Sequence, residues 1–217
     1  MSKKQQKITL FKIFNTPVVL DPIALITPIA VFGLGSWVAG RLTTNRPGFL
    51  RLRFGLIAMI VYQISELIHY LGHIISSWWV EAPMDKVYLT FPLPSSIYYD
   101  NLVTPDQHIG RSMGGPIINI LTVIKVLFLR PFTRSGSFLR ELVDLSVWMN
   151  LLFGIVALFP LPFIDGGTIL KWRLVKQGQS EAEADLAVRK TNLFFVGVLM
   201  GVGMFFALWE RLKRLRG

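Results

Sequence analysis

Long runs of apolar residues, each about the length that crosses a lipid bilayer, constrain this chain more than any other feature of its sequence. Only 17% of the 217 residues are charged, against about 25% in an ordinary soluble domain, and the mean hydropathy is +0.50. Both values favour an all-α polytopic membrane protein with a core of about five to six segments. The runs that predict these segments are residues 22–40, 54–80, 113–129, 142–164 and 192–209.

Two stretches outside these runs favour short strands at the membrane surface. Residues 8–21 alternate loosely and predict a strand or an amphipathic lead-in to the first segment. Residues 81–112 combine aromatic and β-branched residues with several prolines, which favours a short hairpin or a re-entrant loop. We expect the whole chain, residues 1–217, to form a single membrane-embedded domain.

The net charge of +10 indicates contact with a membrane rather than with nucleic acid. Arginine and lysine residues flank the apolar runs, where basic side chains meet anionic headgroups and resist translocation. No nucleic-acid-binding motif accompanies the charge, so the expected partner is the lipid bilayer. The chain has no cysteine, which excludes disulfides and thiolate metal ligands.

Three ionisable residues inside the second apolar run mark a candidate site, because such a residue deep in a membrane segment is costly without a partner. Glu66, His69 and His73 are spaced so that they share one face of a helix. Two histidines one turn apart can bind the same metal ion, as in zinc sites. The same pair can instead hydrogen-bond across helices without a metal, and the spacing leaves both interpretations open. The third histidine, His108, is expected on the surface or in a loop.

A carboxylate follows the fourth run, in the stretch FPLPFIDGG. Pro160 and Pro162 are expected to unwind this segment, and broken helices at membrane depth are tolerated where they line a polar cavity. Asp165 would then face that cavity. Two imidazole nitrogens and one carboxylate oxygen leave one tetrahedral position open, as in catalytic zinc sites. His69, His73 and Asp165 are therefore the candidate ligands of one Zn²⁺ ion per chain.

Three motifs, in this order along the chain, resemble the site-2 protease family of intramembrane zinc metalloproteases. They are HxxxH at residues 69–73, MGGPIINI at 113–120 and FPLPFIDGG at 159–167. The second motif also offers small residues where helices can pack closely. The resemblance covers about residues 8–175 and implies a helical membrane core, with zinc held by His69, His73 and Asp165. It further implies that a transmembrane segment of another protein is the substrate or partner. It also implies that this chain is a multi-pass protein of a prokaryotic cell membrane.

Two positions depart from the pattern of this family. Its first motif is HExxH, in which the glutamate is the general base, whereas this chain has Tyr70 at that position. Its later motif carries an asparagine three residues before the first proline, whereas this chain has Ala157 there and Asn150 further upstream. The retained ligands and the missing base predict a pseudoprotease or a weakly active peptidase.

Tyr70 and Glu66 are the candidate catalytic residues in place of the missing base. A tyrosine, with an ordinary pKa near 10, is a poor base and would rather donate a hydrogen bond or fill the site. Glu66 could be a relocated base, an extra ligand, a partner that orients a histidine, or a carboxylate in a wet cavity. Two alternatives therefore stay open: an active protease that uses Glu66, and a membrane metal-binding or transport protein that uses these histidines and carboxylates.

Overall fold

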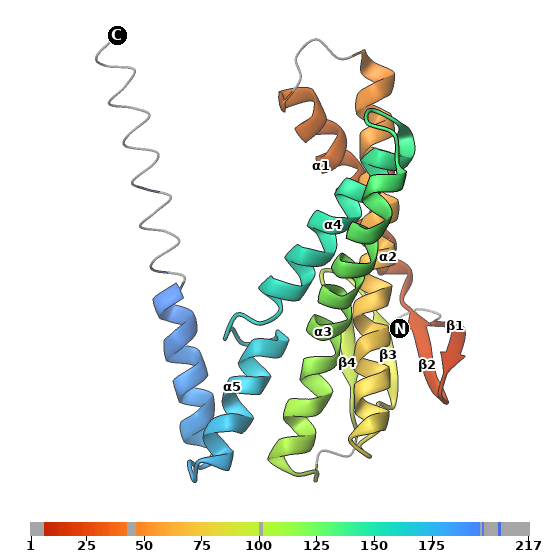
Figure 1. The fold of residues 1–217 in the computed structure, drawn as a ribbon. Coiled ribbons are helices and arrows are strands. Elements are labelled where there is room, and N and C mark those ends of the chain that lie inside the picture. The colour runs from red at the N-terminus through yellow and green to blue at the C-terminus, as the bar shows by residue number, and fades with distance from the viewer. Residues whose placement is uncertain (1–6, 43–46, 100–101, 196, 198–203, 205–217) are drawn as a thin grey trace, which may run out of the picture.

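The computed structural model describes residues 7–42, 47–99, 102–195, 197 and 204, and most of them are helical (Figure 1). Residues 181–195 form a helix that follows α5. The elements in chain order are β1 Ile8–Ile13, β2 Thr16–Leu20, η1 Pro22–Leu25, α1 Ile26–Leu42, α2 Gly48–Trp79, β3 Lys86–Leu89, β4 Ser95–Ile97, α3 Pro105–Leu129, η2 Arg130–Phe132, α4 Phe138–Val156 and α5 Asp165–Lys176.

Three helical stretches among the described residues are long and apolar enough to cross a bilayer: Pro22–Arg41, Gly48–Trp79 and Pro105–Phe132. They overlap the first three predicted segments, although the second and third begin six and eight residues earlier than predicted, and they indicate a membrane protein. α2 has 32 residues. At about 1.5 Å per residue it is about 48 Å long, which exceeds the hydrocarbon core of about 30 Å. Part of α2 therefore extends beyond that core.

Of the last two predicted segments, one is shorter than predicted and the other is largely not described. α4 begins after Ser137, whose side chain accepts a hydrogen bond from the Arg140 amide, and ends at Val156 rather than at residue 164. The helix ends early because the chain unwinds ahead of Pro160. The predicted segment 192–209 lies largely outside the described residues.

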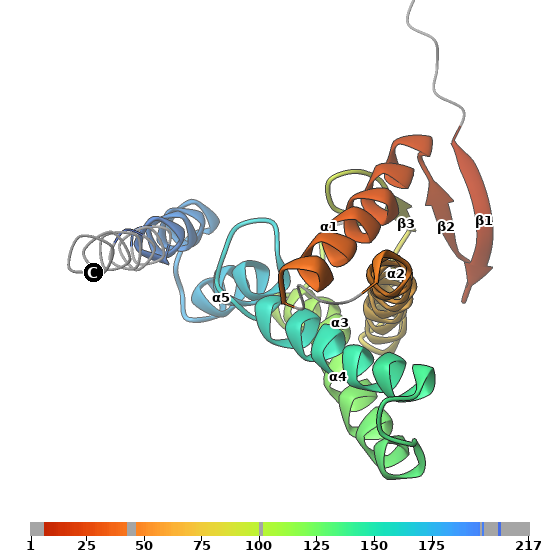
Figure 2. The ribbon, with the colours of Figure 1, turned by 90° about the horizontal axis from the view of Figure 1, so that it is seen from above.

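The two stretches expected at the membrane surface join in one four-stranded sheet of order β1-β2-β3-β4. β1 and β2 are antiparallel and turn at Phe14 and Asn15, which both have positive φ, whereas β2 pairs in parallel with β3. Val18 and Val87 of the sheet pack in one apolar cluster with Ile74 of α2. The sheet is thus anchored on α2, and Figure 2 shows β1 and β2 on the opposite side of α2 from α5.

α2 and α3 run side by side in opposite directions (Figure 1) and touch through glycines. A Cβ on Gly72 would lie 2.3 Å from the carbonyl oxygen of Gly114, and a Cβ on Gly114 would lie 2.2 Å from that of Gly72. Only residues without a Cβ allow this approach. The close packing predicted for the stretch 113–120 is confirmed.

Candidate metal centre

α2 places two imidazoles at one point of its buried face. The Nε2 atoms of His69 and His73 are 3.1 Å apart, and both residues are buried. α3 passes directly over them, because a Cβ on Gly115 would lie 2.5 Å from His69 Cε1 and from His73 Nε2. A residue larger than glycine at position 115 would push α3 away from the imidazoles.

Asp165 reaches the same point from α5. Its Oδ2 lies 3.2 Å from His69 Nε2, and its Oδ1 lies 3.2 Å from His73 Nε2. Asp165 is the first residue of α5, directly after the break that ends α4. The structure therefore brings together the three side chains that the sequence predicted as ligands. We call His69, His73 and Asp165 the metal trio.

Two glycines after Asp165 allow the break between α4 and α5 to fold tightly. The Gly166 amide donates to the carbonyl oxygen of Ala157 at 2.7 Å. A Cβ on Gly167 would lie 2.0 Å from the carbonyl oxygen of Leu161. The FPLPFIDGG stretch thus folds back on itself, and this directs the Asp165 carboxylate at the histidines.

The Nδ1 atom of each histidine faces a hydrogen-bond acceptor. His69 Nδ1 lies 2.7 Å from Asn119 Oδ1, and His73 Nδ1 lies 2.8 Å from the carbonyl oxygen of Arg111. A carbonyl oxygen only accepts, so each neutral imidazole carries its proton on Nδ1 and keeps the Nε2 lone pair for the trio. The sequence did not reveal these contacts, because MGGPIINI was interpreted as a family motif and for packing, without a role for Asn119, and Arg111 acts through its backbone.

The donor set fits zinc. The ligand atoms of the metal trio all lie within 4.8 Å of one another. Tetrahedral ligands about 2.0–2.1 Å from a zinc ion are about 3.3–3.4 Å apart. The separations here are 3.1 and 3.2 Å, so little movement would be needed to hold the ion. Two imidazole nitrogens and one carboxylate oxygen are also the donors of zinc sites that keep one position open.

Comparisons with known proteins agree with this geometry. No family model matches the chain. Over 84 residues, 38% of this chain and 44% of the relative, it is 27% identical to the "Putative zinc metalloprotease MJ0611" of Methanocaldococcus jannaschii. It superposes on the site-2 protease from Methanocaldococcus jannaschii with a TM-score of 0.60 and 21% identity, over 95% of this chain and 87% of that one. The chain has the site-2 protease fold. The predicted resemblance to the site-2 protease family is thereby confirmed, although the sequence match spans less than half of the curated relative.

Within this site-2 protease fold, the hydroxyl of Tyr70 is engaged outside the metal trio. It donates to the carbonyl oxygen of Pro94, in the loop between β3 and β4, at 2.6 Å. The centroid of its ring is 5.7 Å from that of His69 and 5.9 Å from that of His73. Tyr70 therefore ties α2 to this loop, and its predicted place in the chemistry of the site stays a prediction.

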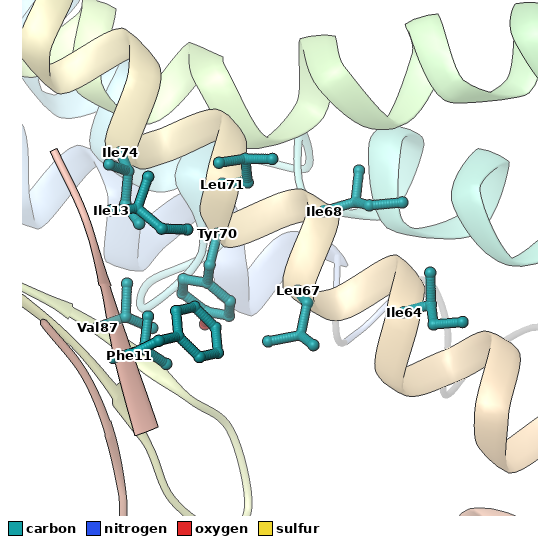
Figure 3. Close-up of a pocket in the computed structure, with 10 residues that line it drawn as sticks. Phe11, Ile13, Ile64, Leu67, Ile68, Tyr70, Leu71, Ile74 and Val87 are labelled. Atoms are coloured by element: carbon teal, nitrogen blue, oxygen red, sulfur yellow. The ribbon is translucent and has the colours of Figure 1, made fainter. Parts of the chain in front are cut away.

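Tyr70 also lines an apolar cavity of about 200 Å³ between α2 and the sheet (Figure 3). The close-up shows the Tyr70 ring beside Phe11 of β1, with Leu67 and Ile74 of α2 on either side of it. The ring is thus a neighbour of both the histidines and this apolar cavity.

Glu66 is not a member of the group of described residues that could hold a metal ion. It is buried, and its Oε1 accepts a hydrogen bond from the Tyr62 hydroxyl at 3.1 Å. It lines a separate cavity of about 50 Å³ together with Gln63 and Pro94. Its role as a substitute base stays a prediction.

The expectation that His108 lies on the surface or in a loop is wrong. His108 is buried in α3, and its ring stacks on that of Trp172 of α5, with the centroids 3.7 Å apart and the planes 2° from parallel. The error arose because hydropathy placed the start of this helix at residue 113, whereas α3 already begins at Pro105. The stacked pair joins α3 to α5.

Proposed function

We propose that this chain is a multi-pass protein of a prokaryotic cell membrane that binds zinc at a site-2-protease-type centre and has weak or no peptidase activity. Its main role would be to bind transmembrane segments of other proteins. The observation that carries the proposal is the assembled metal trio beside a Tyr70 whose hydroxyl is engaged with Pro94.

The expected weakness of the peptidase follows from the groups around the metal trio. His69, His73 and Asp165 would hold the zinc ion, which when bound polarises a substrate carbonyl. Hydrolysis also needs a base within reach of the attacking water, and such a base typically contributes about 10²–10⁴-fold to the rate. Tyr70 is unsuited to that task, because a phenol has an ordinary pKa near 10 and this hydroxyl donates a hydrogen bond to the carbonyl oxygen of Pro94.

The surroundings of Tyr70 support an apolar partner. The cavity beside its ring is lined by apolar side chains. Two of these, Ile64 and Leu67 of α2, are 52% and 39% exposed, so the cavity continues onto an apolar surface of the helix. A transmembrane segment that lies along α2 could insert an apolar side chain there without exposing polar groups to lipid.

The first test is the zinc content of the full chain purified in detergent. We expect about one zinc per chain, and none in the His69→Ala/Asp165→Ala double variant. A wild-type chain without bound zinc would contradict the proposal.

The second test is cleavage of a model transmembrane substrate by the Tyr70→Glu variant, with Tyr70→Gln as the control of similar size. We expect cleavage to rise at least about 10-fold with glutamate and not with glutamine, because only the carboxylate can act as a base. Wild-type cleavage that Glu66→Gln abolishes would instead indicate an active protease with a relocated base. Zinc flux into proteoliposomes that His69→Ala abolishes would indicate a transporter.

A further inference from the structure

We propose that Asn119 is a positioning residue of the metal centre, and that Asn150 holds Asn119 in the orientation which that centre needs. The inference rests on the metal binding in the proposed function. It links α4, which contributes no ligand, to His69 on α2 through one side chain of α3.

The side-chain amide of Asn119 is fully buried, and all of its polar atoms have partners. Its Oδ1 accepts from His69 at 2.7 Å. Its Nδ2 donates to Asn150 Oδ1 at 2.8 Å and to the carbonyl oxygen of Ser65 at 3.2 Å. A flipped amide would set its oxygen against these two acceptors, so the amide has one favourable orientation.

Asn150 is fixed in the same way from the other side. It is 1% exposed, and its Nδ2 donates to Ser65 Oγ and to the carbonyl oxygen of Ser146, both at 2.9 Å. These two bonds leave Asn150 Oδ1 to face Asn119. Asn150 therefore acts on His69 through Asn119 and not by direct contact.

The consequence for His69 is a fixed tautomer and a fixed ring plane. With Asn119 Oδ1 as acceptor, the proton stays on Nδ1, and the lone pair of Nε2 points toward His73 and Asp165. Hydrogen-bond partners behind a metal-binding histidine typically contribute about 10–100-fold to metal affinity. The effect is expected to be strong here, because both asparagine side chains of the network are buried.

The test is titration of the metal-free full chain in detergent with Zn²⁺, and with Co²⁺ to record its ligand-field spectrum. Asn119→Leu and Asn119→Asp both lose the amide donors, but only the aspartate keeps an acceptor for His69. We expect Asn119→Leu to bind zinc about 10–100-fold more weakly and with an altered cobalt spectrum. Asn119→Asp should retain affinity within about threefold, and Asn150→Leu should show a smaller loss than Asn119→Leu.

Thr122→Val is the matched control, because Thr122 is on α3 and its hydroxyl bonds only to the carbonyl oxygen of Ile118 among the contacts described for it. It should bind zinc like the wild type. A folded Asn119→Leu chain with wild-type affinity would overturn the inference and leave the proposed function standing. Should Asn119→Leu fail to fold, unchanged zinc affinity in Asn150→Leu would overturn the inference that Asn150 acts on the metal centre through Asn119. A wild-type chain that binds no zinc would overturn both the proposed function and the inference.

Discussion

Tyr70 lies next to the metal trio in the chain, at the position where a base was expected, but its hydroxyl makes its contact elsewhere. It directly follows His69 on α2, yet its hydroxyl reaches a carbonyl oxygen of the loop between β3 and β4. The sequence predicted the loss of a base at this position, but not the new contact. That contact depends on a loop more than twenty residues away along the chain.

Tyr70→Phe isolates this contact. We expect it to lower the free energy of unfolding by about 0.5–1.5 kcal/mol, the usual net contribution of one hydrogen bond. Zinc affinity should not change, because the hydroxyl does not contact the metal trio. The measurements are thermal melting and zinc titration in detergent. Tyr99→Phe is the control. Tyr99 is 71% exposed, so the loss of its hydroxyl should hardly affect the free energy of unfolding. A fall in zinc affinity of more than about 10-fold in Tyr70→Phe would contradict this assignment.

The other residues of the site also divide into those that the sequence predicted and those that only the structure revealed. His69 and His73 were predictable, because an ionisable residue in an apolar run is costly without a partner, and Asp165 was predictable because it follows a proline break expected to line a polar cavity. Gly115 and Asn119 were not predictable as parts of the centre, because their effect depends on which helix packs over the histidines. The small residues of 113–120 predicted close helix packing, but not that the helix would pack over these histidines.

At the scale of elements, hydropathy predicted where the helices lie but not where they begin and end. α3 starts at Pro105 because Thr104 and Gln107 form a capping box, a signal that an average over apolar residues does not detect. α4 ends at Val156, so the unwinding expected at Pro160 is confirmed, although the apolar run that predicted this segment continues to residue 164. The parallel pairing of β2 with β3 joins segments far apart in the chain, and periodicity in each strand does not report its partner.

Gly72→Ala tests the packing of α2 on α3. The added Cβ would lie 2.3 Å from the carbonyl oxygen of Gly114 and 2.6 Å from Ile118 Cγ2, so the helices must separate. We expect a loss of about 1–3 kcal/mol in stability, as for other overpacked cores, and weaker zinc binding, because Asn119 moves with α3.

The control for this prediction is Gly33→Ala in α1, where an added Cβ meets nothing within 4 Å. There the higher helix propensity of alanine should leave stability unchanged or raise it by up to about 1 kcal/mol. The measurement is the melting temperature of each variant compared with that of the wild type. Equal melting temperatures for Gly72→Ala and the wild type would show that the two helices do not depend on this contact.

At the scale of the whole molecule, the metal trio connects parts of the chain that are far apart in sequence. α2 supplies two ligands and α5 supplies the third, almost a hundred residues later. α3 packs on both of these helices. A metal ion at this point would thus cross-link α2 to α5, and its binding energy would add to the stability of the folded chain.

Zinc is therefore expected to raise the melting temperature of the full chain in detergent, and EDTA to reverse the rise. Free zinc at one hundred times its dissociation constant should contribute about 2.7 kcal/mol, provided that it binds the folded chain alone. Asp165→Ala should abolish the shift, because it removes the ligand that α5 supplies. Asp144→Ala should retain it, since Asp144 pairs with Arg130 and Arg140 away from the trio. An equal shift in Asp165→Ala and the wild type would mean that zinc stabilises the protein at another place, and that α5 is held in the fold by its packing on α3.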